Sequence, residues 1–83
     1  METLEELRKA IDAIDAQIMT LIDSRIALAR RIGKLKRDSD RPVEDPAREK
    51  TVLDHCEAFT HTKALKRVYR CLLEASKDVQ RAP

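Results

Sequence analysis

Residues 4–38 read LEELRKAIDAIDAQIMTLIDSRIALARRIGKLKRD, a stretch without proline and with one glycine, Gly33. Alternate steps of three and four residues from Leu4 trace a stripe that an α-helix places on one face. Its members are Leu4, Leu7, Ile11, Ile14, Ile18, Leu21, Arg25, Leu28, Ile32 and Leu35. Thr3 followed by Glu6 is typical of a capping box at a helix start. The sequence therefore predicts one helix from Leu4 to about Asp38, roughly 50 Å long.

Two shorter helices are expected after this long one. Ser39, Asp40 and Pro42 predict a loop, and Asp45-Pro46 predicts a new helix with aspartate as N-cap and proline at the first helical position. That helix is expected to end near Thr60, with its apolar face formed by Val52, Leu53, Cys56 and Phe59. Thr62 is the predicted cap of a third helix, whose apolar stripe is Leu65, Val68, Leu72, Ala75 and Val79.

Length and composition indicate one all-α domain over residues 1–83. The chain has only two aromatic residues, Phe59 and Tyr69, while Leu, Ile, Ala and charged residues dominate. A chain of this size buries a modest core, and two short helices cannot cover the whole apolar stripe of a 50 Å helix. We therefore expect a homodimer in which a second subunit covers the rest.

Charge and cysteine usage exclude several classes of protein. Seventeen basic and fifteen acidic residues give a net charge of +2, and the basic run from Arg30 to Arg41 lacks interleaved aromatic residues, so nucleic-acid binding is not expected. No apolar run reaches the length of a membrane span and no signal-peptide pattern follows Met1, which favours a cytoplasmic protein without membrane contact. Cys56 and Cys71 are expected to be buried free thiols, not metal ligands.

Polar residues that interrupt the apolar stripes are the candidate ligand-binding residues. Arg25 lies in the stripe of the long helix without a carboxylate on the same stripe, which suggests that an anion balances its charge. Lys36 lies eleven residues later, about three turns along and roughly 20° around the helix, so both cations face one way. The alternative is that both side chains extend past the stripe to solvent.

The two shorter helices carry further candidates. Arg48 falls in the first turn of the second helix, where free N–H groups and a cation together suit an anion, and Glu49 aligns with its apolar face. Ser76 and Gln80 lie one turn apart on the third helix and extend the line through Tyr69 and Leu73. Solvated charges in the first turn and a frayed helix end are the alternative interpretations of these four residues.

These residues resemble a known family. The stretches LRKAIDAIDAQIMTLIDSRIALARRIGKLK, RPVEDPARE and EASKDVQ are similar to the three helical blocks of the AroQ-type, all-helical chorismate mutases, over nearly the whole chain. The segment between Glu49 and Ser76 is shorter than in that family. The resemblance implies an intertwined homodimer with two active sites, and it implies the rearrangement of chorismate to prephenate without metal or cofactor.

The resemblance also implies a role for each site residue. Arg25, Lys36, Asp45, Arg48, Glu49, Ser76 and Gln80 would come from one subunit and Arg8 from its partner. The three arginines and Ser76 would bind the two carboxylates of chorismate, Lys36 and Gln80 would donate to its ether oxygen, and Glu49 with the Asp45 backbone would hold its hydroxyl.

The spacing along the long helix agrees with a shared site. Arg8 precedes Arg25 by seventeen residues, about 25 Å along the axis, so one chain cannot bring both to a small ligand. Antiparallel pairing of two long helices that cross near Met19 would bring Arg8 of one chain to the region between Arg25 and Lys36 of the other.

Two other functions remain open from the sequence. An isochorismate pyruvate lyase of the same fold shares the basic residues, but that family, unlike this chain, does not keep the acidic residue after the arginine of the second helix, so Glu49 favours the mutase. A non-catalytic helical dimerisation module would use Arg25 as a polar residue that sets the register of a coiled seam.

Overall fold

The structure is a computed structural model that describes residues 1–82, and all regular structure within them is helical. Helix α1 spans Leu4–Asp38, α2 spans Pro46–His55, the 3-10 helix η1 spans Cys56–Ala58, and α3 spans Thr62–Arg81. The prediction of an all-α chain with one very long and two short helices is confirmed. No helix among the described residues is long and apolar enough to cross a membrane.

Helix α1 begins and ends where the sequence predicted. The Thr3 hydroxyl accepts a hydrogen bond from the Glu6 N–H at 3.1 Å, which satisfies one of the free donors of the first turn. At the other end Asp40 adopts a left-handed conformation with φ of 58°. The Arg41 N–H donates to the Lys36 carbonyl at 2.7 Å and the Asp40 N–H to the Arg37 carbonyl at 3.2 Å. This Schellman-type ending turns the chain back toward α2.

The start of α2 also follows the prediction, but the second connection differs from it. Asp45 caps α2, and its side chain accepts from the Arg48 N–H at 3.1 Å. The helix tightens into η1 before Phe59, whose side chain is 62% exposed instead of belonging to the buried face. Thr62 does not cap α3: its hydroxyl donates to the Phe59 carbonyl at 2.6 Å, and His61 occupies the N-cap position without a side-chain bond.

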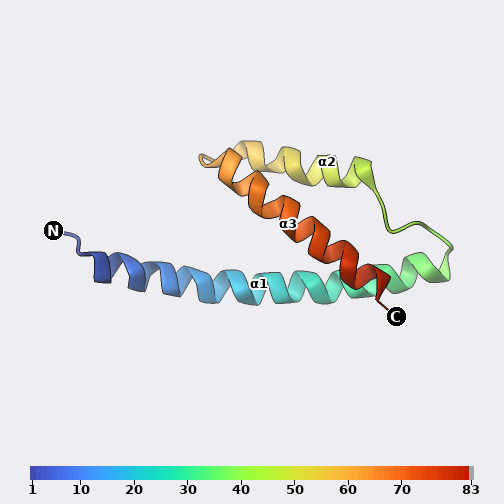
Figure 1. Ribbon diagram of the computed structural model, residues 1–83, viewed down its shortest axis with the longest axis horizontal. Helices are drawn as coiled ribbons and strands as arrows, with labels where there is room; N and C mark the ends of the chain where they lie inside the picture. The colour runs from blue at the N-terminus through green and yellow to red at the C-terminus, as the bar shows by residue number, and fades with distance from the viewer. Residues whose placement is uncertain (83) are drawn as a thin grey trace.

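Figure 1 shows α2 and α3 as a hairpin over one part of α1, with α3 crossing the C-terminal half of the long helix. At this crossing Gly33 is buried, and a Cβ placed on it would lie 2.6 Å from both the Cα and the carbonyl oxygen of Gln80. The absent side chain therefore lets the two backbones touch. The predicted apolar stripe of α3 is not its buried face. Val68 and Ala75 are exposed, and the buried residues Leu73, Ser76 and Gln80 lie on the neighbouring line of the helix.

The first turns of α1 project beyond the hairpin (Figure 1). The apolar stripe that runs along the whole of α1, from Leu4 to Leu35, has nine aliphatic members, and each is between 44% and 68% exposed in the single chain. The buried hydrophobic residues are few: Ala29, Val52, Cys56 and Leu73. Cys71 is exposed, against the expectation that both thiols are buried, while Cys56 is buried as expected. The single chain thus leaves most of its apolar seam in contact with solvent.

Candidate active site

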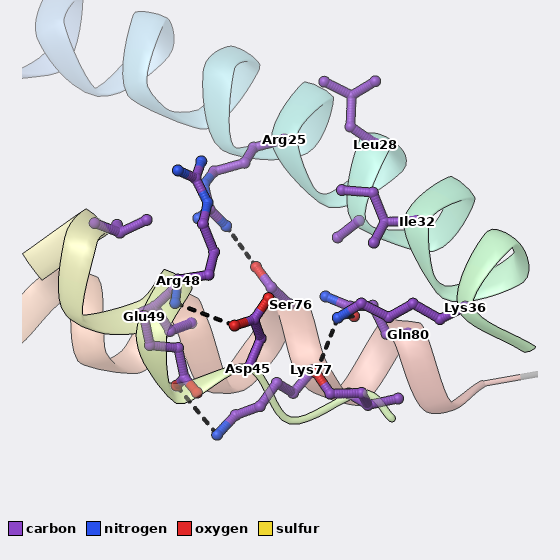
Figure 2. Close-up of a pocket in the computed structure, with 14 residues that line it drawn as sticks. Arg25, Leu28, Ile32, Lys36, Asp45, Arg48, Glu49, Ser76, Lys77 and Gln80 are labelled. Atoms are coloured by element: carbon purple, nitrogen blue, oxygen red, sulfur yellow. Dashed lines mark hydrogen bonds and ion pairs between the residues drawn. The ribbon is translucent and has the colours of Figure 1, made fainter. Parts of the chain in front are cut away.

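A cavity of about 480 Å³ lies between the C-terminal half of α1, the first turns of α2 and the last turns of α3. Its size is in the ordinary range for a small-molecule site. Seven of the eight site residues predicted from the sequence line it: Arg25, Lys36, Asp45, Arg48, Glu49, Ser76 and Gln80. Figure 2 shows these side chains directed into one space from three segments of the chain.

Arg25 enters the cavity from α1 and is held by α3. Its Nη1 donates to the Ser76 hydroxyl at 2.5 Å, and its guanidinium carbon lies 6.0 Å from the centre of the Tyr69 ring. The Ser76 hydroxyl in turn donates to the Leu72 carbonyl at 2.8 Å. No carboxylate among the described residues forms an ion pair with Arg25. Its positive charge is therefore positioned but not neutralised.

Lys36 and Gln80 meet at the other end of the cavity. The Lys36 ammonium donates to the Val43 carbonyl and to Oε1 of Gln80, each at 3.0 Å. Because an ammonium can only donate, Gln80 accepts through its oxygen and keeps its amide N–H groups available for a ligand. The Gln80 side chain belongs to a residue only 9% exposed, so the alternative of a frayed surface end is wrong.

The first turn of α2 supplies the remaining wall. Asp45 and Arg48 are exposed at the cavity mouth, whereas Glu49 is half-buried. The Asp45 carboxylate accepts a hydrogen bond from the Arg48 N–H through Oδ1. Arg48 reaches the same cavity as Arg25 from the opposite helix (Figure 2). Two guanidinium groups from different helices can bind separate carboxylates of one ligand.

Arg8 is the predicted site residue that the single chain does not bring to the cavity. It is exposed in the part of α1 that projects beyond the hairpin, and it does not line the cavity. Its separation from Arg25 along the rigid helix, about 25 Å, excludes a contribution to the same chain's cavity.

The sequence did not indicate the roles of two residues, Lys77 at the cavity and Gly33 at the crossing of α1 and α3. Lys77 lines the cavity and forms ion pairs with Glu44, Glu49 and Glu74. The hydrogen bonds that the Lys77 ammonium donates to these carboxylates, above all the one to Glu74, raise the pKa of Lys77 above its ordinary value. The same bond lowers the pKa of Glu74. Gly33 was named only as the one glycine of the helical stretch, although a lone glycine inside a helical pattern can signal a close approach of backbones.

Comparison with known proteins gives the family. A family model described as "Chorismate mutase type II" matches residues 7–81. The chain belongs to the type II chorismate mutase family. The resemblance noted in the sequence is thereby confirmed, and with it the prediction of a chorismate mutase.

Individual relatives agree with this family. The chain is 33% identical to a chorismate mutase of Methanocaldococcus jannaschii, over 98% of this chain and 87% of that protein. It is 44% identical to a bifunctional chorismate mutase/prephenate dehydratase of Aquifex aeolicus over 54 residues, which are 65% of this chain and 15% of the larger enzyme. The chain therefore spans a small part of that relative.

A solved structure shares the fold at full length. A conserved hypothetical protein from Pyrococcus furiosus superposes with a TM-score of 0.84 at 42% sequence identity, over 98% of this chain and 99% of that one. The two chains thus match from end to end. In this chain the segment between Glu49 and Ser76 brings Ser76 and Gln80 to the cavity.

Proposed function

We propose that this chain converts chorismate to prephenate in the cavity described above, without metal or cofactor. The reaction breaks one C–O bond and forms one C–C bond within a single molecule, so it needs no nucleophile. The protein must fold the enolpyruvyl side chain over the ring and stabilise negative charge that develops on the ether oxygen. The observation that carries the proposal is the pair Lys36 and Gln80, 3.0 Å apart on the wall of a cavity that Arg25 and Arg48 also line.

Each polar group has a partner in the substrate. Arg25, Arg48 and Ser76 bind and position the two carboxylates. The Lys36 ammonium and the Gln80 amide donate to the ether oxygen, where charge grows in the transition state. Glu49 and the Asp45 backbone hold the ring hydroxyl. Loss of a donor aimed at developing charge costs about 2.7–4 kcal/mol in comparable sites, and each 1.36 kcal/mol is tenfold in rate.

The functional unit in this proposal is a homodimer. Nine exposed aliphatic side chains along α1 support it, because monomers rarely leave an apolar stripe of this length in contact with solvent. Two α1 helices that pair antiparallel about Met19 cover each other's seam. Their symmetry brings Arg8 of each chain to the cavity of its partner, where it adds a third cation for the substrate carboxylates.

The direct test incubates the purified chain with chorismate and follows chorismate loss and prephenate formation. Isochorismate is offered in parallel, because a lyase of the same fold would cleave it. We expect saturable conversion of chorismate with a kcat in the usual range of roughly 1–10³ s⁻¹. Faster cleavage of isochorismate to pyruvate, or no saturable loss of chorismate, would contradict the proposal.

A further inference from the structure

Lys77 stands apart from the other cations of the cavity because carboxylates surround it. It follows Ser76 on α3, its side chain is only 13% exposed, and it lines the cavity. Its ammonium lies 3.3 Å from Oε2 of Glu44, 3.3 Å from Oε1 of Glu49 and 2.8 Å from Oε1 of Glu74. The three carboxylates come from the loop before α2, from α2 and from α3, so one ammonium joins three segments.

The contact with Glu49 ties two walls of the cavity together. Among the described residues, Lys77–Glu49 is the one ion pair that joins α2 to α3. Figure 2 shows this pair at the cavity wall, beside the first turn of α2. Lys77 also reaches Glu44 in the loop that leads into that turn, but Arg81 holds the other oxygen of this carboxylate at 2.6 Å. The link between Glu49 and the helix that carries Ser76 and Gln80 is therefore the contact that depends on Lys77.

The pair also orients and balances the Glu49 carboxylate. Lys77 contacts Oε1, which leaves Oε2 to accept a hydrogen bond from a ligand hydroxyl. A carboxylate without a counter-ion beside a dianionic ligand would repel it. Among the residues that line the cavity, Lys77 is the cation that forms an ion pair with Glu49.

We infer that Lys77 is a positioning residue for chorismate turnover, which acts by holding Glu49 with one carboxylate oxygen directed at the substrate hydroxyl. The inference rests on the proposed function. Lys77 itself does not contact the reacting atoms. Its effect on catalysis passes through Glu49, and this separates it from a lysine that only stabilises the fold.

A double-mutant cycle on kcat/KM for chorismate tests the inference. The variants are Lys77→Met, Glu49→Gln and the two combined, each checked for folding by circular dichroism. We expect Lys77→Met to lower kcat/KM about tenfold or more in the parent, and less than about threefold in the Glu49→Gln background, because coupled residues do not act additively. Lys77→Gln replaces Lys77→Met in the cycle if the methionine variant does not fold.

Lys50→Met is the matched control, because it removes a lysine from an exposed ion pair with Asp54 at 2.8 Å on the outer side of α2. It should change kcat/KM less than about twofold. Equal losses from the Lys77 substitution in both backgrounds, or no loss in the parent, would overturn the inference and leave the proposed function intact. A parent chain that does not turn over chorismate would overturn both.

Discussion

At the scale of single residues, the site holds two cations in place without neutralising their charge. Arg25 is oriented by a hydroxyl and an aromatic ring, and Lys36 by a carbonyl and an amide oxygen. Neutral partners fix the geometry of a cation without cancelling its charge. The full electrostatic attraction is therefore kept for an incoming anion, which is the arrangement that electrostatic catalysis requires.

Arg25→Leu tests this arrangement. Ser76 keeps its bond to the Leu72 carbonyl, so the substitution leaves no donor unpaired, and leucine continues the apolar stripe of α1. We expect thermal stability to be unchanged or raised while kcat/KM falls at least about a hundredfold. Thermal melts and kinetics measure the two effects. A loss of stability above about 2 kcal/mol would mean that Arg25 has a structural role.

Gln80→Glu tests donation to the ether oxygen through pH dependence. A carboxylic acid donates only while protonated, and its anion would repel charge that develops on that oxygen. Activity of the variant should be retained at acid pH and fall as pH rises through the pKa of the new carboxyl group. Lys36, 3.0 Å from Oε1, lowers that pKa, whereas burial raises it.

The measurement for Gln80→Glu is a pH–rate profile from about pH 4.5 to 8, a window that spans the usual range of a perturbed glutamate. The parent enzyme is the control, because its amide does not titrate there. A variant profile parallel to that of the parent would show that Gln80 does not face the reacting ether.

At the scale of elements, the crossing of α1 and α3 sets the distance between Lys36 and Gln80. Arg37 strengthens it, because its Nη1 donates to the Gln80 carbonyl at 2.6 Å. Both contacts lie within one turn of Gly33, whose missing side chain permits the approach. The packing of the two helices and the geometry of the site are thus decided at the same place.

Gly33→Ala should therefore impair both stability and catalysis. Alanine is favoured over glycine inside a helix by about 1 kcal/mol. Here its Cβ would lie 2.6 Å from backbone atoms of Gln80, which cannot move aside as a side chain could. We expect a net loss of stability of roughly 1–2 kcal/mol and a kcat/KM lowered at least about tenfold. Lys34→Ala, at the neighbouring exposed position, should leave both nearly unchanged; the same result for Gly33→Ala would show that the crossing tolerates a side chain.

Local signals explain which parts of the fold were predictable. The starts of α1 and α2 follow from Thr3 and Asp45, whose side chains act within three residues. The prediction of Thr62 as the cap of α3 was wrong, because its hydroxyl donates to the Phe59 carbonyl instead, and the sequence does not distinguish these two bonds. The apolar stripe predicted for α3 was on the wrong line of the helix, because the buried face includes the polar residues Ser76 and Gln80 and apolar periodicity does not detect such a face.

The same reasoning applies to the site. Arg25 and Lys36 were found because they lie on the apolar face of a long helix, where a charge is unexpected. Lys77 was not found, because a lysine three residues after Glu74 is typical of a solvated pair on a helix surface. Its contacts with Glu44 and Glu49 depend on how α2 packs against α3, and sequence spacing does not contain that information.

At the scale of the whole molecule, the chain is an extended body of 57 × 25 × 14 Å. Its cavity lies at one end of α1, and Arg8 lies near the other. A site completed by Arg8 would therefore require two chains. In the proposed homodimer, the surface that buries the apolar stripe of α1 would also bring Arg8 to the cavity of the partner, so that activity would depend on association.

A subunit-mixing experiment distinguishes an active site shared between two chains from one contained in a single chain. Arg8→Ala and Lys36→Ala should each be inactive as pure dimers. After subunit exchange, a mixed dimer has one site with both residues intact and one with neither. Random mixing makes half of the dimers mixed, so about a quarter of the parent activity should return. The mass from light scattering should be about twice the 9.5 kDa of one chain.

The matched control mixes Arg25→Leu with Lys36→Ala. Both of these residues belong to the same chain's cavity, so the mixed dimer has one site without Arg25 and one without Lys36. Its activity should stay at the level of the pure variants, and recovery in the first mixture but not in this control assigns Arg8 to the partner's site. If exchange is demonstrated by mass and the Arg8→Ala mixture still gains nothing, the two residues do not meet across the interface. The apolar seam of α1 would then require another explanation than a shared active site.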